Sequence, residues 1–173
     1  FKVKGYSAVT MRDIAQALDI KAASLYNHIK SKQEILVLIV IEIAEEFTNR
    51  INCIAISDLK TIEKIENVID LHIDITIRNP EALACLNNDW MHLTDDELTY
   101  FIKMREDYEE TFRNLIKSGI QSNEIKNLNP EVLIFSILST LRTLYLWYGK
   151  KKPLTEASLK KSMAEVLLKG IVK

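Results

Sequence analysis

"GYSAVTMRDIAQALDIKAASLYNHIKSKQEIL", residues 5–36, decides the fold at the amino-terminal end of this chain. The tetrapeptide TMRD has the spacing of a capping box, and the apolar positions after it predict a short helix over about 11–18. A second short helix is predicted over 22–29, because apolar residues recur on one face at i, i+4 spacing. Ser31 and Glu34 form a further capping box that begins a longer helix.

Two short helices joined by a tight turn are the plan of a helix-turn-helix, whose second helix enters the DNA major groove. With its apolar face turned to the core, the second helix leaves outside Ala22, Ala23, Ser24, Tyr26, Asn27 and His28. The alanine methyls suit contact with thymine, the Asn27 amide suits adenine, and the hydroxyls suit phosphate oxygens. Thr10 and Lys32 stand at the starts of the two flanking helices, where free N–H groups attract phosphate. The sequence therefore predicts a surface for double-stranded DNA.

The charge of the chain is unevenly distributed, although its formal net charge is only −1. Residues 1–34 hold six Lys and Arg against three Asp and Glu, a net charge of +3, which leaves −4 for residues 35–173. Only four glycines and three prolines occur in 173 residues, and the Asn-Gly and Asp-Gly dipeptides typical of hairpins are missing. The composition therefore predicts an all-α fold with a basic amino-terminal end.

The cysteines and the apolar runs predict a cytoplasmic protein. Cys53 and Cys85 lie in apolar surroundings without CxxC spacing, so we expect reduced structural thiols. The longest nearly charge-free apolar run, residues 35–41, is too short to span a membrane, and no signal peptide is visible. The chain begins at Phe1 in what looks like the end of a helix, so we expect a segment upstream of it.

Further capping and proline signals divide the rest of the chain into helices. They predict helices from Ser31 to the low fifties, over 58–78, from Pro80, over 94–120, over 131–148, and from Thr155 to about Gly170, with Lys150–Pro153 closing the fifth. We expect a helix-turn-helix domain over 1–36, most of whose first helix is missing, and a ligand-binding and dimerisation domain over 37–173.

The predicted helix 131–148 is apolar on nearly every side, so it must be covered on nearly every side. The last helix can cover only part of it. A second copy of the chain is the simplest remaining cover, which predicts a homodimer through the last two helices; a buried central helix in a monomer is the alternative. The expected interface residues are Leu144, Trp147, Leu159, Met163, Val166 and Leu167.

The stretch 5–36 resembles the DNA-binding domain of TetR-family transcriptional regulators. The matching positions are Gly5, Tyr6, Thr10, Ile14, Ala15, Ile20, Leu25, Tyr26, His28, Lys32 and Leu36. The resemblance implies a homodimer on a palindromic operator, with Thr10, Tyr26 and Lys32 on phosphates and the helix 21–28 on bases.

Three positions depart from the family pattern. Asp19 stands where glycine is usual in a left-handed turn, and aspartate tolerates that conformation at modest cost. Lys21 replaces a serine N-cap, which should cost about 1 kcal/mol of helix stability but places a cation toward DNA. Ile29 replaces an aromatic residue and should be an exchange within the core.

The carboxy-terminal part resembles the ligand domain of the TetR subgroup of fatty-acid and sterol degradation repressors, on Leu93, Tyr108, Gly119, Pro130, Trp147 and Tyr148. The resemblance implies acyl-CoA thioesters as the effector class and requires no cofactor. We expect the effector to shift helix 32–54 and so to lower operator affinity. The candidate ligand-binding residues are Ile73, Ile77, Trp90, Tyr108, Phe112, Leu138, Leu141, Arg142 and Tyr145.

Arg142 is a cation in an apolar helix, so it needs an anionic partner. That partner is either a phosphate or carboxylate of the ligand or a protein carboxylate such as Glu109. A helical enzyme or carrier with a His/carboxylate site is the alternative function. No predicted helix carries a histidine and two carboxylates in register, so we expect neither an enzyme nor a metal site.

Overall fold

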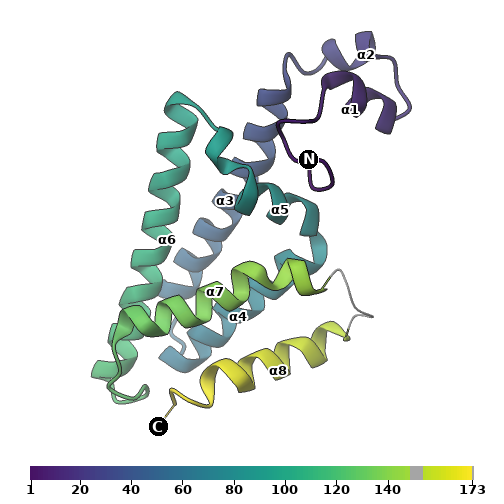
Figure 1. Ribbon diagram of the computed structural model, residues 1–173. Coiled ribbons are helices and arrows are strands. Elements are labelled where there is room, and N and C mark those ends of the chain that lie inside the picture. Colours follow the sequence, from purple (N-terminus) through teal and green to yellow (C-terminus); the bar gives the residue numbers. More distant parts are fainter. Residues whose placement is uncertain (149–153, 173) are drawn as a thin grey trace.

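The computed structural model describes residues 1–148 and 154–172 of the chain. Within these ranges the elements are α1 (Met11–Ala17), α2 (Ala22–Tyr26), α3 (Lys32–Ile56), α4 (Thr61–Arg78), α5 (Pro80–Asn88), the 3-10 helix η1 (Trp90–His92), α6 (Asp95–Gln121), α7 (Pro130–Tyr148) and α8 (Glu156–Leu168). The one β contact in these ranges is an isolated bridge between Ile125 and Val172. The all-α prediction is confirmed (Figure 1).

The predicted helix 22–29 is shorter in the structure. α2 ends at Tyr26, although the N–H groups of His28 and Ile29 still donate to the Leu25 carbonyl, at 3.1 and 3.0 Å. The chain therefore continues as a hydrogen-bonded turn, and Asn27 and His28 follow the helix instead of lying within it.

Two predicted helix starts also differ. α4 begins at Thr61, not at residues 57–58, because the Glu63 carboxylate accepts the Lys60 N–H at 2.9 Å and so caps the chain there. α6 begins after Thr94 as predicted, but the Thr94 side chain makes no capping hydrogen bond. The end of α7 that the sequence assigns to 150–153 lies outside the described residues.

The amino-terminal capping boxes hold the ends of the helix-turn-helix unit. At α1 the Thr10 hydroxyl accepts the Asp13 N–H, and the Asp13 carboxylate accepts the Thr10 N–H at 2.8 Å. At α3 the Ser31 hydroxyl accepts the Glu34 N–H, but the Glu34 carboxylate accepts the N–H of Lys30, at 2.7 Å. The first box forms completely, and the second reaches one residue further back.

The helix-turn-helix unit has a small core of its own. Its buried residues are Met11, Ala15 and Leu25, with Ile14, Ala22, Ile29 and Ile35 packed against them. Asp19, in the turn between α1 and α2, has φ 55°, the left-handed conformation expected at this position. The predicted turn therefore forms with aspartate in place of glycine.

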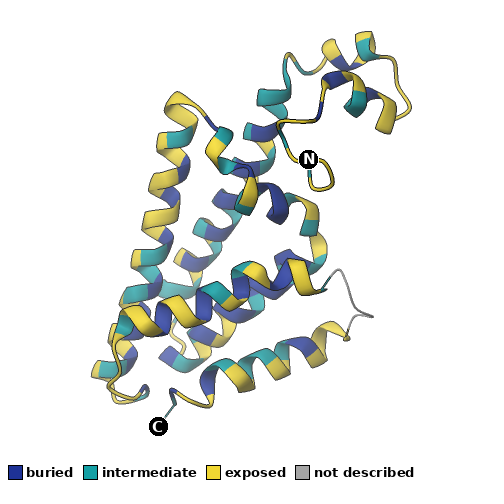
Figure 2. Cartoon of the chain, in the orientation of Figure 1, coloured by how far each residue is buried: buried dark blue, intermediate teal, exposed yellow. Residues whose placement is uncertain are grey.

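α3 leaves the helix-turn-helix unit and runs on into the helical bundle, where α4 and α7 pack along the middle and α6 and α8 lie outside them (Figure 1). The bundle core draws buried residues from α3, α4, α6, α7 and α8, visible as dark blue along these helices in Figure 2. The proposed boundary at 36/37 therefore falls inside one continuous helix. Among the described residues, no helix is both long enough and apolar enough to cross a membrane.

The structure corrects part of the predicted dimer interface. Leu144 is 5% exposed and Leu159 2% exposed, because both pack into the core of their own chain. Met163 and Leu167 are half-buried against the same core. Of the six predicted residues, Trp147 and Val166 are the two that are exposed, at 44% and 75%. The outer faces of α7 and α8 are therefore the parts of these two helices that stay exposed among the described residues.

Candidate functional site

The outward face of the helix-turn-helix unit is polar and accessible. The exposed residues among those predicted to contact DNA are Thr10, Lys21, Ala23, Ser24, Tyr26, Asn27 and His28. Ala22 is a correction, because it is half-buried and packs against the small core of the unit. The hydroxyl of Thr10 is already used in the α1 cap. The arrangement leaves the start and the end of α2 free to meet a nucleic acid.

Asp13 places a fixed negative charge at the start of α1. Hydrogen bonds from the hydroxyl and the N–H of Thr10, helped by Lys4, lower the pKa of this carboxyl to about 2. The carboxylate therefore stays ionised near neutral pH. Any phosphate at this helix start must approach Thr10 from the side away from Asp13.

Lys32 has a structural partner that the sequence did not indicate. Its Nζ donates to the Tyr6 carbonyl at 2.8 Å and lies 4.2 Å from the centre of the Tyr6 ring. The hydroxyl of Tyr6 donates to Gln33 Oε1 at 2.5 Å. Lys32 therefore holds the segment before α1 against the start of α3, and an ammonium group with three donors keeps capacity for a phosphate.

A cavity of about 280 Å³ lies inside the bundle. Its walls come from five helices and η1, and the lining residues are Ala44, Phe47, Thr48, His72, Leu83, Leu86, Asn87, Trp90, Phe101, Met104, Arg105, Tyr108, Leu141 and Arg142. Most of these side chains are apolar. The cavity can therefore hold an apolar group and presents a few polar contacts to it.

The structure brings four of the nine predicted ligand residues to this cavity: Trp90, Tyr108, Leu141 and Arg142. The other five are corrections. Ile73, Ile77, Phe112, Leu138 and Tyr145 do not line it, because they pack elsewhere in the bundle core. Helix membership alone could not say which side of each buried helix meets the cavity.

His72 and Phe47 are lining residues that the sequence analysis did not select. His72 follows Ile65 and Ile69 at helical spacing on the apolar stripe of α4, so its burial was readable from the sequence. Phe47 occupies the corresponding stripe of α3, three residues after Ala44. The sequence does not show whether these two stripes pack directly against each other or leave a space between them. That depends on how the whole bundle packs.

His72 and Tyr108 form the buried polar contact of the cavity. Each is 5% exposed, and His72 Nε2 lies 2.8 Å from the Tyr108 hydroxyl. The Phe47 ring packs against His72, with ring centres 4.7 Å apart. Burial, together with the nearby Arg142, lowers the pKa of His72 to about 3, and burial raises the pKa of Tyr108 above its usual value. Both groups are therefore neutral at physiological pH.

Two arginines share one carboxylate at the more exposed part of the cavity. Arg142 Nη2 lies 2.7 Å from Glu109 Oε1, and Arg105 Nε lies 3.8 Å from the same oxygen. The Arg105 guanidinium also lies over the Trp90 ring, 5.6 Å from its centre. Of the two partners considered for Arg142, the structure contains Glu109. Two cations against one anion leave a net positive charge that suits an anionic ligand group.

The wall formed by α5 and η1 contacts both the cavity and the helix-turn-helix end. Leu86 and Trp90 line the cavity from this wall. On its other side, Asp89 Oδ1 accepts the Tyr6 N–H at 3.2 Å, and the His92 ring stacks on the Tyr6 ring with centres 4.9 Å apart. The His92 carbonyl also accepts Gln33 Nε2 at 2.9 Å. One short wall therefore touches the cavity and the segment that Lys32 holds.

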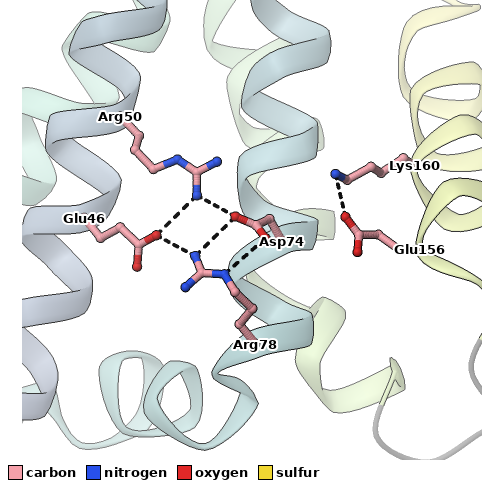
Figure 3. A network of polar contacts seen from close by, with 6 residues as sticks. All are labelled: Glu46, Arg50, Asp74, Arg78, Glu156 and Lys160. Carbon is pink, nitrogen blue, oxygen red and sulfur yellow. Dashed lines mark hydrogen bonds and ion pairs between the residues drawn. The ribbon is translucent and has the colours of Figure 1, made fainter.

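A four-residue ion network joins α3 to α4 (Figure 3). Arg50 Nη1 lies 2.6 Å from Asp74 and 3.2 Å from Glu46, while Arg78 Nη2 lies 2.6 Å from Glu46 and its Nε 3.1 Å from Asp74. Hydrogen bonds from Arg78 and Arg50 hold the pKa of the Asp74 carboxyl below its usual value. Each charge meets two opposite charges, which fixes the two helices side by side.

Comparison with known proteins gives the relationships of the chain. Residues 58–171 match the family model of the tetracyclin repressor-like C-terminal domain, and residues 1–39 match that of bacterial regulatory proteins of the tetR family. The HTH-type transcriptional repressor KstR2 of Rhodococcus jostii (strain RHA1) is 22% identical over 173 residues, which cover 99% of this chain and 85% of that protein.

Two solved structures share the fold. The ketosteroid transcriptional regulator KstR2 of Mycobacterium tuberculosis has a TM-score of 0.92 at 20% identity, over 100% of this chain and 89% of that one. AibR in complex with isovaleryl coenzyme A and operator DNA has a TM-score of 0.80 at 20% identity, over 95% of this chain and 90% of that one. The arrangement of helices is therefore shared along nearly the whole chain.

The buried neutral His72 predicts a specific pH dependence of stability. Below pH 6.5 the unfolded chain protonates this histidine, while the folded chain does so only near pH 3, so the free energy of unfolding falls as the pH drops through this window. Between pH 7.5 and 5 the wild type should lose about 2 kcal/mol more than His72→Gln, measured by urea denaturation. Carboxylate contributions are common to both proteins and cancel. Equal losses in the two proteins would contradict a neutral buried His72.

Proposed function

Because the chain belongs to the TetR family of bacterial regulatory proteins, we propose that a small apolar or acyl-type effector releases this repressor from a palindromic operator. The family consists of transcriptional regulators, not enzymes, which disfavours the alternative of a helical enzyme with a His/carboxylate site. The observation that carries the proposal is the wall of α5 and η1, because it touches both the effector cavity and the DNA-binding end.

The DNA-binding surface that we propose is centred on α2. Three of its exposed residues are Lys21 before the helix, Tyr26 at its end and Asn27 just after it. The lysine and the tyrosine hydroxyl suit phosphate oxygens, and the asparagine amide suits a base edge. Ala23, Ser24 and His28 complete this face, and Thr10 and Lys32 flank it. Lys32 is assigned two tasks, because it also holds the Tyr6 carbonyl. A substitution of Lys32 would therefore disturb both.

The proposed homodimer uses the outer faces of α7 and α8. Val132, Phe135 and Leu146 are exposed at 58, 72 and 48%, and they recur along one side of α7 at helical spacing. Trp147 and Val166 extend the apolar surface at the end of α7 and onto α8. Such a surface supports a two-fold interface between copies of the chain, which would place two α2 helices on the two halves of a palindrome.

The size and charge of the cavity support an acyl-type effector. A cavity of about 280 Å³ lies at the small end of the range for ligand pockets, so it suits a short acyl chain better than a whole coenzyme A thioester. A thioester would therefore keep its nucleotide part outside, near the cations Arg105 and Arg142. AibR, which shares the fold, was solved with isovaleryl coenzyme A and operator DNA.

The proposed response runs through two contacts. An effector between α3 and α5 would press on Phe47 and Trp90, and so move both α3 and the α5–η1 wall relative to the helix-turn-helix unit. Asp89 and His92 would carry the second movement to Tyr6. The effector acts only through its higher affinity for the conformation that does not fit the operator.

The DNA-binding surface is tested with Lys21→Ala/Tyr26→Ala. Loss of these phosphate contacts should weaken binding to duplexes selected from a random pool by at least about tenfold. The slope of log affinity against log salt should fall by about 1 per lysine removed. The matched control is Lys103→Ala/Tyr100→Ala on α6, where both residues are exposed far from α2 in sequence. Unchanged affinity in the α2 variant would refute this surface.

The dimer is tested with Phe135→Glu/Val166→Glu. Carboxylates buried without a partner in an apolar interface should dissociate the dimer, which light scattering after gel filtration would show as a halved mass. Ile56→Glu is the matched control, since Ile56 is 84% exposed at the end of α3. A dimer that survives the double substitution lies on another surface.

The effector class is tested with octanoyl-CoA as the probe. It should lower operator affinity in fluorescence anisotropy titrations, and Arg142→Leu should raise the concentration needed by about tenfold, because an arginine contact with an anionic group is lost. Arg113→Leu is the control, since Arg113 also pairs with carboxylates but does not line the cavity. No release by octanoyl-CoA would argue against thioesters, and an unchanged Arg142→Leu response would place Arg142 outside effector binding.

A further inference from the structure

The His72–Tyr108 pair has one polar hydrogen more than its own contact uses. A neutral histidine carries one N–H and a tyrosine one O–H, and the contact of 2.8 Å between them uses one of these two hydrogens. If Nε2 accepts, the N–H at Nδ1 is left; if Nε2 donates, the hydroxyl hydrogen of Tyr108 is left. In either tautomer one donor remains in the pair.

In the described part of the chain, the His72–Tyr108 contact is the one hydrogen bond that these two side chains make, and the remaining hydrogen has no protein acceptor. Both side chains are 95% buried and both line the cavity, so the remaining donor belongs to a side chain in contact with the space where an effector would sit. A buried donor without an acceptor is costly, and most buried donors in proteins are paired. Thr76, one turn further along the same helix, carries a fully buried hydroxyl without a partner among the described residues.

The other polar groups of the cavity are already engaged. The Thr48 hydroxyl donates to the Ala44 carbonyl at 2.9 Å, and Asn87 Nδ2 donates to the Leu83 carbonyl at 2.9 Å. Arg142 is paired with Glu109. The spare donor of the His72–Tyr108 pair therefore differs from them, because it is neutral, buried and uncommitted.

We propose that this pair binds an uncharged oxygen, a ketone or a hydroxyl, carried on the apolar part of the effector. The inference rests on the proposed function of the cavity as the effector site, and it names a chemical feature of the effector beyond its apolar or acyl character. A neutral donor favours a neutral acceptor, because a carboxylate moved into this buried position would lose its hydration while the nearby cation Arg142 is already paired with Glu109. A purely hydrocarbon effector would leave the donor unsatisfied.

The test uses cyclooctanone and methylenecyclooctane, which differ in shape by little more than C=O against C=CH₂. Both are compact rings of a size that a cavity of about 280 Å³ can hold, and neither carries its functional group at a particular place along a chain. Binding is followed by the fluorescence of Trp90 in a Trp147→Phe background, where it is the single tryptophan left of the two in the chain. Neither probe contains coenzyme A.

His72→Leu/Tyr108→Phe removes every polar hydrogen of the pair and replaces both partners together, which avoids leaving one of them unsatisfied. In this variant the affinity for cyclooctanone should fall about tenfold relative to the parent, while the affinity for methylenecyclooctane stays the same or rises. Thr48→Val is the control, because it removes a cavity hydroxyl whose hydrogen is already donated; the ketone affinity should not change.

Three results would overturn the proposal: an equal change for both probes, the same loss of ketone binding in Thr48→Val, or no binding of cyclooctanone to the parent protein. If this double variant does not fold, His72→Phe/Tyr108→Phe is measured in its place, because it also carries no polar hydrogen and its ring better fills the volume of the imidazole; an unchanged ketone affinity there has the same meaning. Operator binding and its release by octanoyl-CoA are separate readouts, so a failure of the proposed function is distinguished from a failure of this assignment.

Discussion

The continuity of α3 constrains everything else in this molecule. It is one helix of 25 residues, Lys32–Ile56, about 37 Å long, whose first turn belongs to the helix-turn-helix unit and whose middle forms a cavity wall. A sharp kink would disrupt its backbone hydrogen bonds, so in the proposed response a displacement at Phe47 would be passed along the helix to Lys32. The core of the helix-turn-helix unit and the core of the bundle are connected by α3 and by the contacts of Tyr6 with Asp89 and His92.

Two further contacts determine how α3 can move. The network of Glu46, Arg50, Asp74 and Arg78 joins α3 to α4 about halfway along α3 (Figure 3). Partly exposed ion pairs are individually weak, and this network acts through its geometry more than through its energy. Near the other end, the stacking of Tyr6 on His92 joins the helix-turn-helix unit to the cavity wall.

The cavity combines a neutral interior with a charged opening. His72 is held neutral because burial disfavours its cationic form, and Arg142 adds to that effect. Arg142 and Arg105 share Glu109 and are partly exposed. An apolar body with a neutral oxygen inside and an anionic group outside is the ligand chemistry that meets both conditions. This division of polarity restricts the range of proposed effectors more strongly than the size of the cavity alone.

Local signals in the sequence were sufficient to predict most of the helices. The capping box at Thr10, the left-handed turn at Asp19 and the prolines at helix starts act within a few residues, so the all-α fold and the helix-turn-helix plan could be predicted from the chain alone. The same holds for the polar outer face of α2, although Ala22 is half-buried in its small core.

Tertiary packing alone determined which residues line the cavity, which stay exposed for a partner and which contact each other across the chain. Ile73 and His72 are neighbours on α4 and both are buried, yet only His72 meets the cavity, because the partner helices determine which buried side faces a space. Leu144 was available in the sequence for a dimer interface, but its own chain covers it. Lys32 reaches Tyr6 across 26 positions, a distance at which no local pattern can signal a contact. The periodicity of apolar residues indicates which residues are buried. Only the folded chain shows which neighbours they pack against.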